Sequence, residues 1–227
     1  MAASVIKTCY LCGDSIIGRA SSDHVPPRQF YSKEIRTLHN PNLLTLPTHA
    51  PCNRAYQLDE EYFIHTMVPM VLESYAGKSV LRELLAQYQS NRNVKLSRSV
   101  LKEFDEKPSG LILPKGKIVK RIDPERTWRV VWKIIRGLFY FEYKRILPEK
   151  TPRSFKVVPP GEKPPTEFFF IPDDNIRGQY PGVFDYKFRQ FPEVKGVHLW
   201  AMLLWDRLIL LSVFHDPECN CSRCNET

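Results

Sequence analysis

The most regular pattern of apolar residues lies in the segment 123–143. Its large apolar side chains recur every three or four residues, at Trp128, Val131, Trp132, Ile135, Leu138 and Phe139. This spacing predicts an α-helix whose apolar stripe packs against a sheet or another helix. Asp123 and Pro124 favour a helix start there, as a cap and a first-turn proline. The opposite face carries a basic row, Arg129, Lys133 and Arg136.

Shorter helical patterns precede this segment. Residues 54–76 are expected to be mostly helical, with Pro69 bending or ending the helix and Gly77 as a stop. Residues 79–89, SVLRELLAQYQ, carry apolar residues at helical spacing, and a third helix is expected at about residues 97–105. These patterns predict a helical brace in the middle of the chain.

Apolar runs predict strands in the C-terminal half. LILPKGKIVKRI, residues 111–122, predicts a hairpin around a Pro-Lys-Gly turn. The connector 148–165 allows one short strand, SFKVV, and the runs TEFFFI and GVFDYKFRQF follow it. The run 197–214 is best divided at Asp206-Arg207 into two strands of a hairpin, with a buried helix as the alternative. Residues 109–217 are therefore expected to form a largely antiparallel sheet covered by the Trp128 helix.

Composition allows a packed core and argues against a membrane span. The chain has 227 residues, of which 43% are hydrophobic. The run 197–214 approaches membrane length, but Asp206 and Arg207 interrupt it, which is costly in lipid. Six cysteines without an N-terminal apolar signal region favour metal binding in a reducing compartment over a disulfide framework. A cytoplasmic protein is therefore expected.

Two pairs of metal-ligand residues lie near the N-terminus. They are Cys9-x2-Cys12 and His49-x2-Cys52, separated by 36 residues. Three thiolates and an imidazole fill a tetrahedral Zn²⁺ site and leave no open position, so the predicted zinc is structural. The tail holds a further set, His215, Cys219, Cys221 and Cys224. That set could bind a second metal, or it could be a frayed terminus with free thiols.

Between the two N-terminal pairs lies an Asp23-His24 dipeptide, followed by Asn42-Leu43 and Cys52-Asn53. This order resembles the HNH endonucleases, also called ββα-metal nucleases, over about residues 5–66. The resemblance implies a strand that carries Asp-His, a second strand that carries Asn-Leu, and a helix that begins at the Cys-Asn step. It also implies hydrolysis of DNA phosphodiester bonds.

Such hydrolysis needs a base to activate water and a cation to neutralise charge on the phosphate. The resemblance implies that His24 is the general base, since imidazole titrates near neutrality. It implies that Asp23 and Asn53 hold a catalytic Mg²⁺ or Mn²⁺, for which carboxylate and amide oxygens are suitable ligands. Asn42 would orient the His24 imidazole, with Asn40 as a rival for that role.

Other polar residues of this region have simpler interpretations. Asp59, Glu60 and Glu61 could add a metal ligand, but acidic residues early in a helix are ordinary partners of the helix dipole. His65 is expected to pack or to face solvent, and His39 lies in a turn-like HNPN run.

The net charge of +8 is unevenly distributed. Segment 111–164 has 14 Lys and Arg residues against 5 Asp and Glu residues. A basic region outside the catalytic unit is expected to bind a phosphate backbone, and Arg129, Lys133 and Arg136 are the predicted DNA contacts. The alternative is a solvated basic surface that keeps the protein soluble.

These observations predict an α+β protein with three parts. Residues 1–66 form the zinc-supported HNH unit, 67–108 a helical connector, and 109–227 an α+β domain that binds substrate or partner and ends in the Cys-rich tail. The expected function is that of a metal-dependent HNH endonuclease acting on double-stranded DNA. The chain resembles stand-alone bacterial or phage HNH proteins, some of which serve phage defence or mobile elements. Alternatives are a zinc-containing module that binds nucleic acid or protein without cutting, and a nuclease switched by a ligand or partner at the C-terminal domain. The partners expected besides DNA are another protein or a second copy of the chain.

Overall fold

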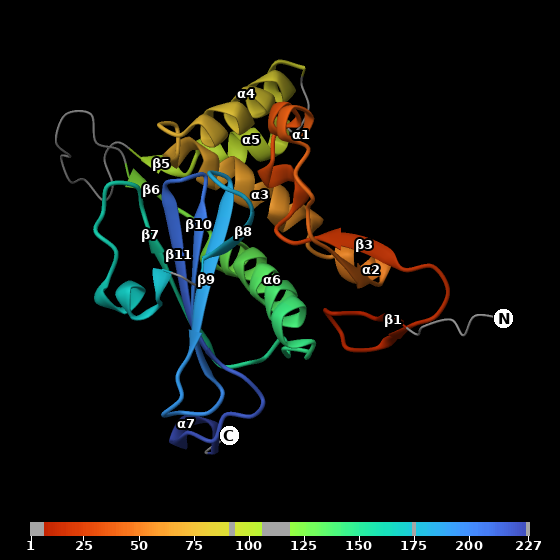
Figure 1. Cartoon of the computed structure of the whole chain (residues 1–227). Helices are drawn as coiled ribbons and strands as arrows, with labels where there is room; N and C mark the ends of the chain where they lie inside the picture. Colours follow the sequence, from red (N-terminus) through yellow and green to blue (C-terminus); the bar gives the residue numbers. More distant parts are fainter. Residues whose placement is uncertain (1–6, 91–93, 106–118, 174–175, 226–227) are drawn as a thin grey trace.

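The structure, a computed structural model, describes residues 7–90, 94–105, 119–173 and 176–225. It confirms a mixed α+β chain with antiparallel sheets. The largest sheet has five strands in the order β7-β11-β10-β9-β8, and helix α6 (Pro124–Tyr143) lies across one face of it (Figure 1). The strands are β7 (Arg153–Val158), β8 (Arg177–Tyr180), β9 (Phe184–Gln190), β10 (Val197–Leu204) and β11 (Leu208–His215).

The N-terminal part consists of two small hairpins and two short helices. Strands β1 (Lys7–Thr8) and β2 (Ser15–Ile16) form the first hairpin. Strands β3 (Ser21–His24) and β4 (Thr45–Thr48) pair antiparallel, with Ser21 opposite Thr48 and His24 opposite Thr45. A turn η1 (Arg28–Phe30) and helix α1 (Lys33–His39) lie between them, and α2 (Ala50–Arg54) follows β4.

The middle of the chain is helical, as expected, with one error in the prediction. Helix α3 (Gln57–Met67) ends in a 3₁₀ turn η2 (Val68–Met70) that contains Pro69. Helix α4 (Tyr75–Gln89) begins at the cap Ser74, whose Oγ accepts from Gly77 N at 2.9 Å. Gly77 therefore lies in the first turn of α4 and is not a stop. It is needed there because a Cβ would come within 2.2 Å of Val71 O.

Later elements differ from the prediction in small ways. Helix α5 (Val94–Leu101) starts and ends earlier than expected, and β5 (Phe104–Asp105) then pairs with β6 (Val119–Lys120). Most of the hairpin predicted at 111–122 lies outside the described residues. The apolar run TEFFFI is not a strand of the sheet: its residues Thr166–Phe170 form a 3₁₀ turn, η4.

The longest predicted helix and the last hairpin are confirmed. Asp123 caps α6 and its side chain accepts from Arg126 N. Strands β10 and β11 pair over their whole length, from Val197 opposite His215 to Leu204 opposite Leu208. Trp205 and Asp206 both have positive φ, at 49° and 57°, which is typical of the tight turn of a two-stranded hairpin.

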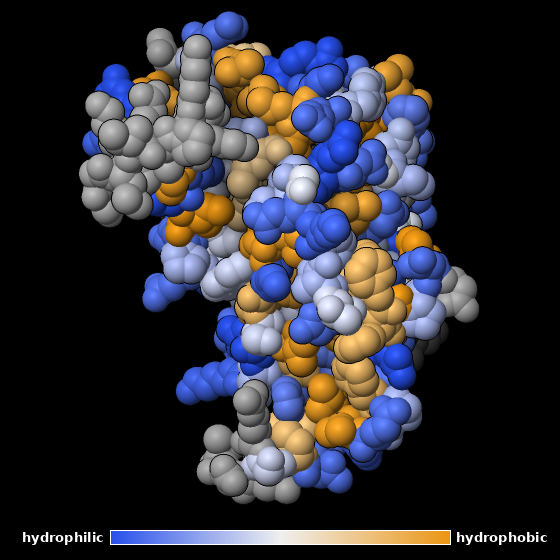
Figure 2. Space-filling view, turned by 90° about the vertical axis from the view of Figure 1, so that its left-hand side faces the viewer, coloured by the Kyte–Doolittle hydropathy of each residue, from blue (hydrophilic) through white to orange (hydrophobic). Residues whose placement is uncertain are grey.

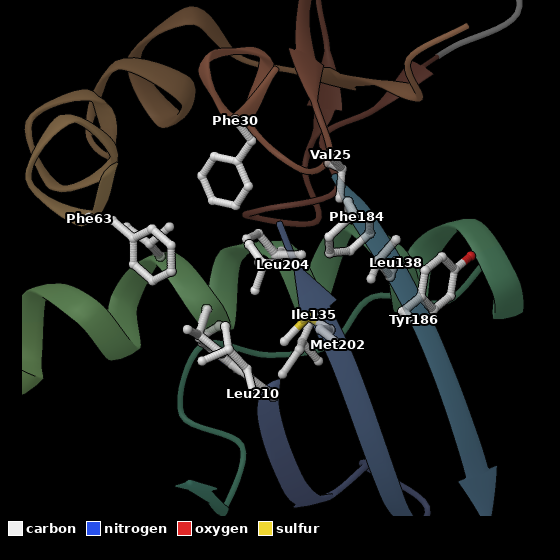
Figure 3. Packing of buried hydrophobic residues seen from close by; sticks show 14 of the residues in the cluster. Val25, Phe30, Phe63, Ile135, Leu138, Phe184, Tyr186, Met202, Leu204 and Leu210 are labelled. Carbon is white, nitrogen blue, oxygen red and sulfur yellow. The ribbon is translucent and has the colours of Figure 1, made fainter. Parts of the chain in front are cut away.

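One hydrophobic core cluster joins the N-terminal part to the large sheet. Val25 and Phe30 point into the same core as Leu138 of α6 and Phe184 and Leu204 of the sheet (Figure 3). A smaller cluster, with Leu199 and Leu211, occupies the other face of the sheet. The domain limits at residues 66 and 108 stay a prediction, but α6 packs against both halves of the chain. On the face seen in Figure 2, hydrophobic and hydrophilic residues are interspersed.

Candidate functional site

Four predicted metal ligands come together beside the first hairpin. Cys9 and Cys12 lie within the β1–β2 turn, where Gly13 adopts φ +85° and its N donates to Cys9 O at 2.8 Å. His49 precedes the first residue of α2, and Cys52 lies within that helix. The four ligand atoms lie within 4.8 Å of one another, and Cys12 Sγ is 3.3 Å from His49 Nδ1.

The chemistry of this cluster fits a metal such as zinc. Burial opposes ionisation of Cys9, but hydrogen bonds from Thr48 and from the backbone outweigh it and lower the pKa of Cys9 to about 6. A thiolate is therefore favoured at a position where a soft tetrahedral cation would bind. A second cluster, His215, Cys219, Cys221 and Cys224, has ligand atoms equally close together and could also bind a metal such as zinc.

Asp23 lies at the centre of a buried network beside this cluster. It is only 4% exposed, and its Oδ2 accepts from Tyr10 OH at 2.5 Å. Both carboxylate oxygens also contact the ammonium of Lys133, at 2.9 Å for Oδ1 and 2.8 Å for Oδ2. The Asp23 charge is therefore balanced from within the protein, by a residue 110 positions further along the chain.

His24 is the last residue of β3 and is partly buried. Desolvation lowers the pKa of His24 from its usual value of 6.5, and the positive charge of Arg28 lowers it further. Asp23 acts in the opposite direction, with a smaller effect. The imidazole is consequently neutral at pH 7, which is the form that can accept a proton.

The three candidate asparagines have different environments. Asn53, in α2, donates from Nδ2 to Ser21 Oγ at 3.5 Å, and its Oδ1 lies 3.4 Å from Lys133 Nζ. Asn42 is exposed and precedes β4 by three residues, so the Asn-Leu step is not in the second strand. No hydrogen bond joins Asn42 to His24 among the described residues. Asn40 is the C-cap of α1, in the left-handed conformation with φ 39°.

Lys133 occupies the place between the two residues predicted to hold the catalytic cation. Its side chain projects from α6, and the residue is 1% exposed. Besides Asp23 and Asn53, its Nζ contacts Glu60 Oε1 at 2.5 Å. A divalent cation would need the same oxygen atoms. In this arrangement the site therefore does not fit a Mg²⁺ or Mn²⁺ ion held by Asp23 and Asn53.

Two of the three residues in the basic row of α6 are buried, and the third forms an ion pair. The buried residues are Lys133 and Arg136, so this arrangement does not make them available as the DNA contacts that the sequence predicts. Arg136 donates to Leu147 O at 2.8 Å and also contacts Leu11 O and Glu149. Arg129 is more exposed, but it pairs with Asp59 at 2.5 Å, as Arg126 does at 2.8 Å. The row thus joins α6 to the N-terminal part.

Several important contacts had no local signal in the sequence. The ammonium of Lys133 and the phenol of Tyr10 reach Asp23 through tertiary packing alone. Glu60 lies in the first turn of α3, as expected for a partner of the helix dipole, and it also contacts Lys133. His65 is packed as expected, with Nδ1 2.6 Å from Tyr88 OH. The effect of Arg28 on His24 does have a local signal, because Arg28 follows His24 by only four residues.

Arg28 and Arg36 are two of the cations whose charges act on His24, together with Lys133. Arg28 is exposed, and Arg36 lies in the last turn of α1. The charge of each guanidinium lowers the pKa of His24. Burial lowers the pKa of Arg36, Arg28 lowers it further, and Glu83 acts in the opposite direction. Among the described residues neither arginine forms an ion pair, so both charges can act on an anion near His24.

A hollow of about 1010 Å³ is lined by residues of the two small hairpins and their connection, among them Lys7, Arg19 and Pro47, and it does not include Asp23 or His24. Among the described helices, none has the length and apolarity needed to cross a membrane.

Comparison of the chain with protein-family models, with curated proteins and with solved structures finds no match.

Proposed function

We propose that the chain is an HNH-type endonuclease that hydrolyses DNA phosphodiester bonds with His24 as general base. The observation that carries the proposal is local: the Asp23-His24 step ends one strand of a hairpin, and α2 follows the other strand with Asn53 beside Asp23. The Cys9, Cys12, His49 and Cys52 cluster lies next to this hairpin, where a zinc ion would join the β1–β2 turn to α2.

The residues around His24 have complementary roles in this proposal. A neutral His24 takes a proton from water, and the resulting hydroxide attacks phosphorus as the bond to the leaving oxygen breaks. Arg28 and Arg36 supply positive charge near the phosphate. A divalent cation, where one binds, would polarise the phosphate and the leaving oxygen. The contacts of Lys133 with Asp23 and Asn53 do not support such an ion in the present arrangement, so no role in the reaction is assigned to it.

The same contacts favour a second candidate function, a module that binds nucleic acid without cutting it. With Asp23 neutralised by Lys133, the η1 turn and α1 still present Arg28 and Arg36 to an anionic partner. DNA binding would then persist without hydrolysis. A control of activity by the C-terminal domain is a third candidate, because α6 carries Lys133 into the site.

Incubation of the purified protein with supercoiled plasmid in EDTA, Mg²⁺ or Mn²⁺ tests the proposal. A His24→Ala variant purified in parallel controls for contaminating nucleases. We expect nicking by the parent protein in at least one of the three conditions and none by the variant. Equal nicking by both proteins would overturn the assignment, whereas a gel shift without nicking in any condition would favour the binding module.

A further inference from the structure

A second group of soft metal ligands lies at the C-terminal end of the large sheet. His215 is the last residue of β11, and Cys224 lies in the short helix α7 (Ser222–Asn225). The Sγ atoms of Cys219 and Cys221 each lie 3.2 Å from His215 Nδ1, and that of Cys224 lies 3.5 Å from it. Three thiols thus surround one imidazole nitrogen.

These separations are close to those around a single tetrahedral ion. With Zn–S bonds of about 2.3 Å and Zn–N bonds of about 2.0–2.1 Å, a tetrahedron places nitrogen and sulfur about 3.6 Å apart. All four ligand atoms already lie within 4.8 Å of one another. A disulfide would use only two of the three thiols, whereas one zinc ion uses every ligand of the set.

The loop that carries these ligands is fixed by contacts of its own. Asp216 is buried, and it accepts from His198 Nε2 at 3.2 Å and from Glu218 N at 2.8 Å. Cys219 N donates to Asp216 O at 3.0 Å. Gly196, in the turn before β10, has φ +78°, and a Cβ there would come within 2.5 Å of Cys219 N. The segment is therefore packed against the sheet and not frayed.

We propose that His215, Cys219, Cys221 and Cys224 bind one structural Zn²⁺ that fastens the C-terminal segment to the end of the sheet. The bound ion would fill all four positions with protein ligands, so it serves stability and not catalysis. Asp216, which follows His215, connects the site to the core. It contacts His198, whose ring stacks on Phe214 at 4.9 Å between centroids. The site is separate from the one at Cys9 and does not depend on the proposed nuclease activity.

Metal stoichiometry tests this proposal. We expect two zinc ions per chain in the full-length protein, one in a Cys221→Ser/Cys224→Ser variant and two in a Ser222→Ala control. A Cys9→Ser/Cys52→Ser variant should also retain one. A tail variant that binds as much zinc as the full-length protein would overturn the proposal. Titration of the metal-free full chain with Co²⁺ adds an answer that needs no variant to fold: two equivalents support the second site, whereas one equivalent together with unchanged zinc in the tail variant contradicts it.

A different observation carries a second inference, which rests on the proposed function. The ammonium of Lys133 contacts the donors that the HNH pattern assigns to a divalent cation. Both oxygens of Asp23 are engaged, and Glu60 adds a third oxygen partner. Lys133 is thus a cation supplied by α6 at the place of a metal.

We infer that Lys133 acts as an internal competitor that keeps divalent cations out of the site while α6 is docked. A cation could then bind Asp23 and Asn53 only after the Lys133 side chain has withdrawn. Such a withdrawal needs movement of α6 or of the N-terminal part, because Lys133 is 1% exposed. Binding of DNA or of a partner that shifts this contact would admit the ion.

Thermal unfolding with and without Mn²⁺ tests this inference without any DNA. Lys133→Met removes the charge and retains most of the volume, so the parent Tm should not respond to Mn²⁺ and the variant Tm should rise. A rise of about 5–10 °C is expected at roughly 100 times the Kd for Mn²⁺. A Lys133→Met/Asp23→Asn variant should lose most of the rise, which assigns it to this site.

Equal responses of the parent protein and Lys133→Met, or no response in either, would overturn the inference. Lys133→Met leaves two buried carboxylates without their partner and could fail to fold, so a Lys133→Met/Glu60→Gln variant provides the same comparison with one charge fewer. Failure of the nuclease assay does not affect this readout. If Lys133→Met responds to Mn²⁺ but does not cut DNA, the inference about Lys133 is supported and the proposed function is contradicted.

Discussion

Gly137 of α6 lies against Val25, the residue that follows His24. A Cβ added to Gly137 would come within 2.6 Å of Val25 Cγ2 and 2.8 Å of Val25 Cγ1. Glycine at this position therefore allows α6 to approach the end of β3 closely. One helical turn earlier on α6, Lys133 reaches Asp23, so the same approach brings the ammonium into the candidate site.

Gly137→Ala should destabilise the protein by about 1–3 kcal/mol, because the added methyl group overpacks a buried contact. The expected effect is larger than the gain in helix propensity, which is about 1 kcal/mol. Urea denaturation of the parent and the variant measures the difference. Val25→Ala provides a matched test: in the double variant, the shorter side chain makes room for the methyl group, and the two effects should not add. Strict additivity would contradict the contact.

A metal bound by the Cys9, Cys12, His49 and Cys52 cluster should support the N-terminal hairpins more than the large sheet. The β1–β2 turn and α2 would be joined by the ion, so its loss should expose the turn and loosen the Asp23 network. We expect Cys52→Ser to lower the Tm and to increase proteolysis within residues 7–54. The Cys221→Ser variant is the control, since it should leave that region protected. Equal cleavage patterns in the two variants would argue against a separate role for each cluster.

Arg28 and Arg36 should contribute more to DNA affinity than the buried residues of the α6 row. Replacing both by alanine should weaken binding and reduce the slope of log K against log salt by about two. Arg98→Ala, an exposed arginine of α5, is the control and should leave the slope unchanged if α5 lies outside the interface. Gel-shift titrations at several salt concentrations provide the measurement. A slope that is unaffected by the double variant would place the DNA elsewhere.

Features determined by neighbouring residues could be predicted from the sequence. The cap at Asp123 and the apolar stripe that follows it fix α6, and the alternation around Asp206 fixes the last hairpin. The paired spacings at Cys9 and His49 gave both halves of a cluster whose atoms lie within 4.8 Å. In each case the residues that determine the feature lie close together in the sequence, within one helix, one hairpin or one spaced pair of ligands.

Features determined by packing could not be predicted in this way. The pattern of α6 shows which face is apolar, but not that acidic residues of another segment cover its basic face. Asp59 and Glu60 lie in α3, far from α6 in the sequence. Only the tertiary fold brings them to Arg129 and Lys133 of α6. The apolar run at Phe168 is similarly ambiguous, because Phe168 alone of its five residues packs on the sheet, and one side chain can do so from a 3₁₀ turn as well as from a strand.

The last prediction concerns the pH dependence of cleavage. The base form of His24 is the neutral imidazole, so the single-turnover rate at saturating DNA should rise with pH and level off once His24 is deprotonated. Because burial and the charge of Arg28 lower the pKa of His24 below 6.5, the midpoint of the rise should lie below pH 6.5. His24→Ala should reduce the rate by about 10²–10⁴-fold at every pH.

Arg28→Ala separates the electrostatic effect on His24 from a loss of DNA binding. Removing that positive charge favours protonation of the imidazole, so the midpoint should move to higher pH, toward the ordinary value of 6.5. Asp23 raises the pKa of His24, and Lys133 and Arg36 lower it, so their charges must be retained in the comparison. Arg19→Ala, an exposed arginine on the β2–β3 connection, is the matched control and should leave the midpoint in place. A midpoint that does not move in Arg28→Ala, or that moves equally in Arg19→Ala, would mean that a group other than His24 controls the rate.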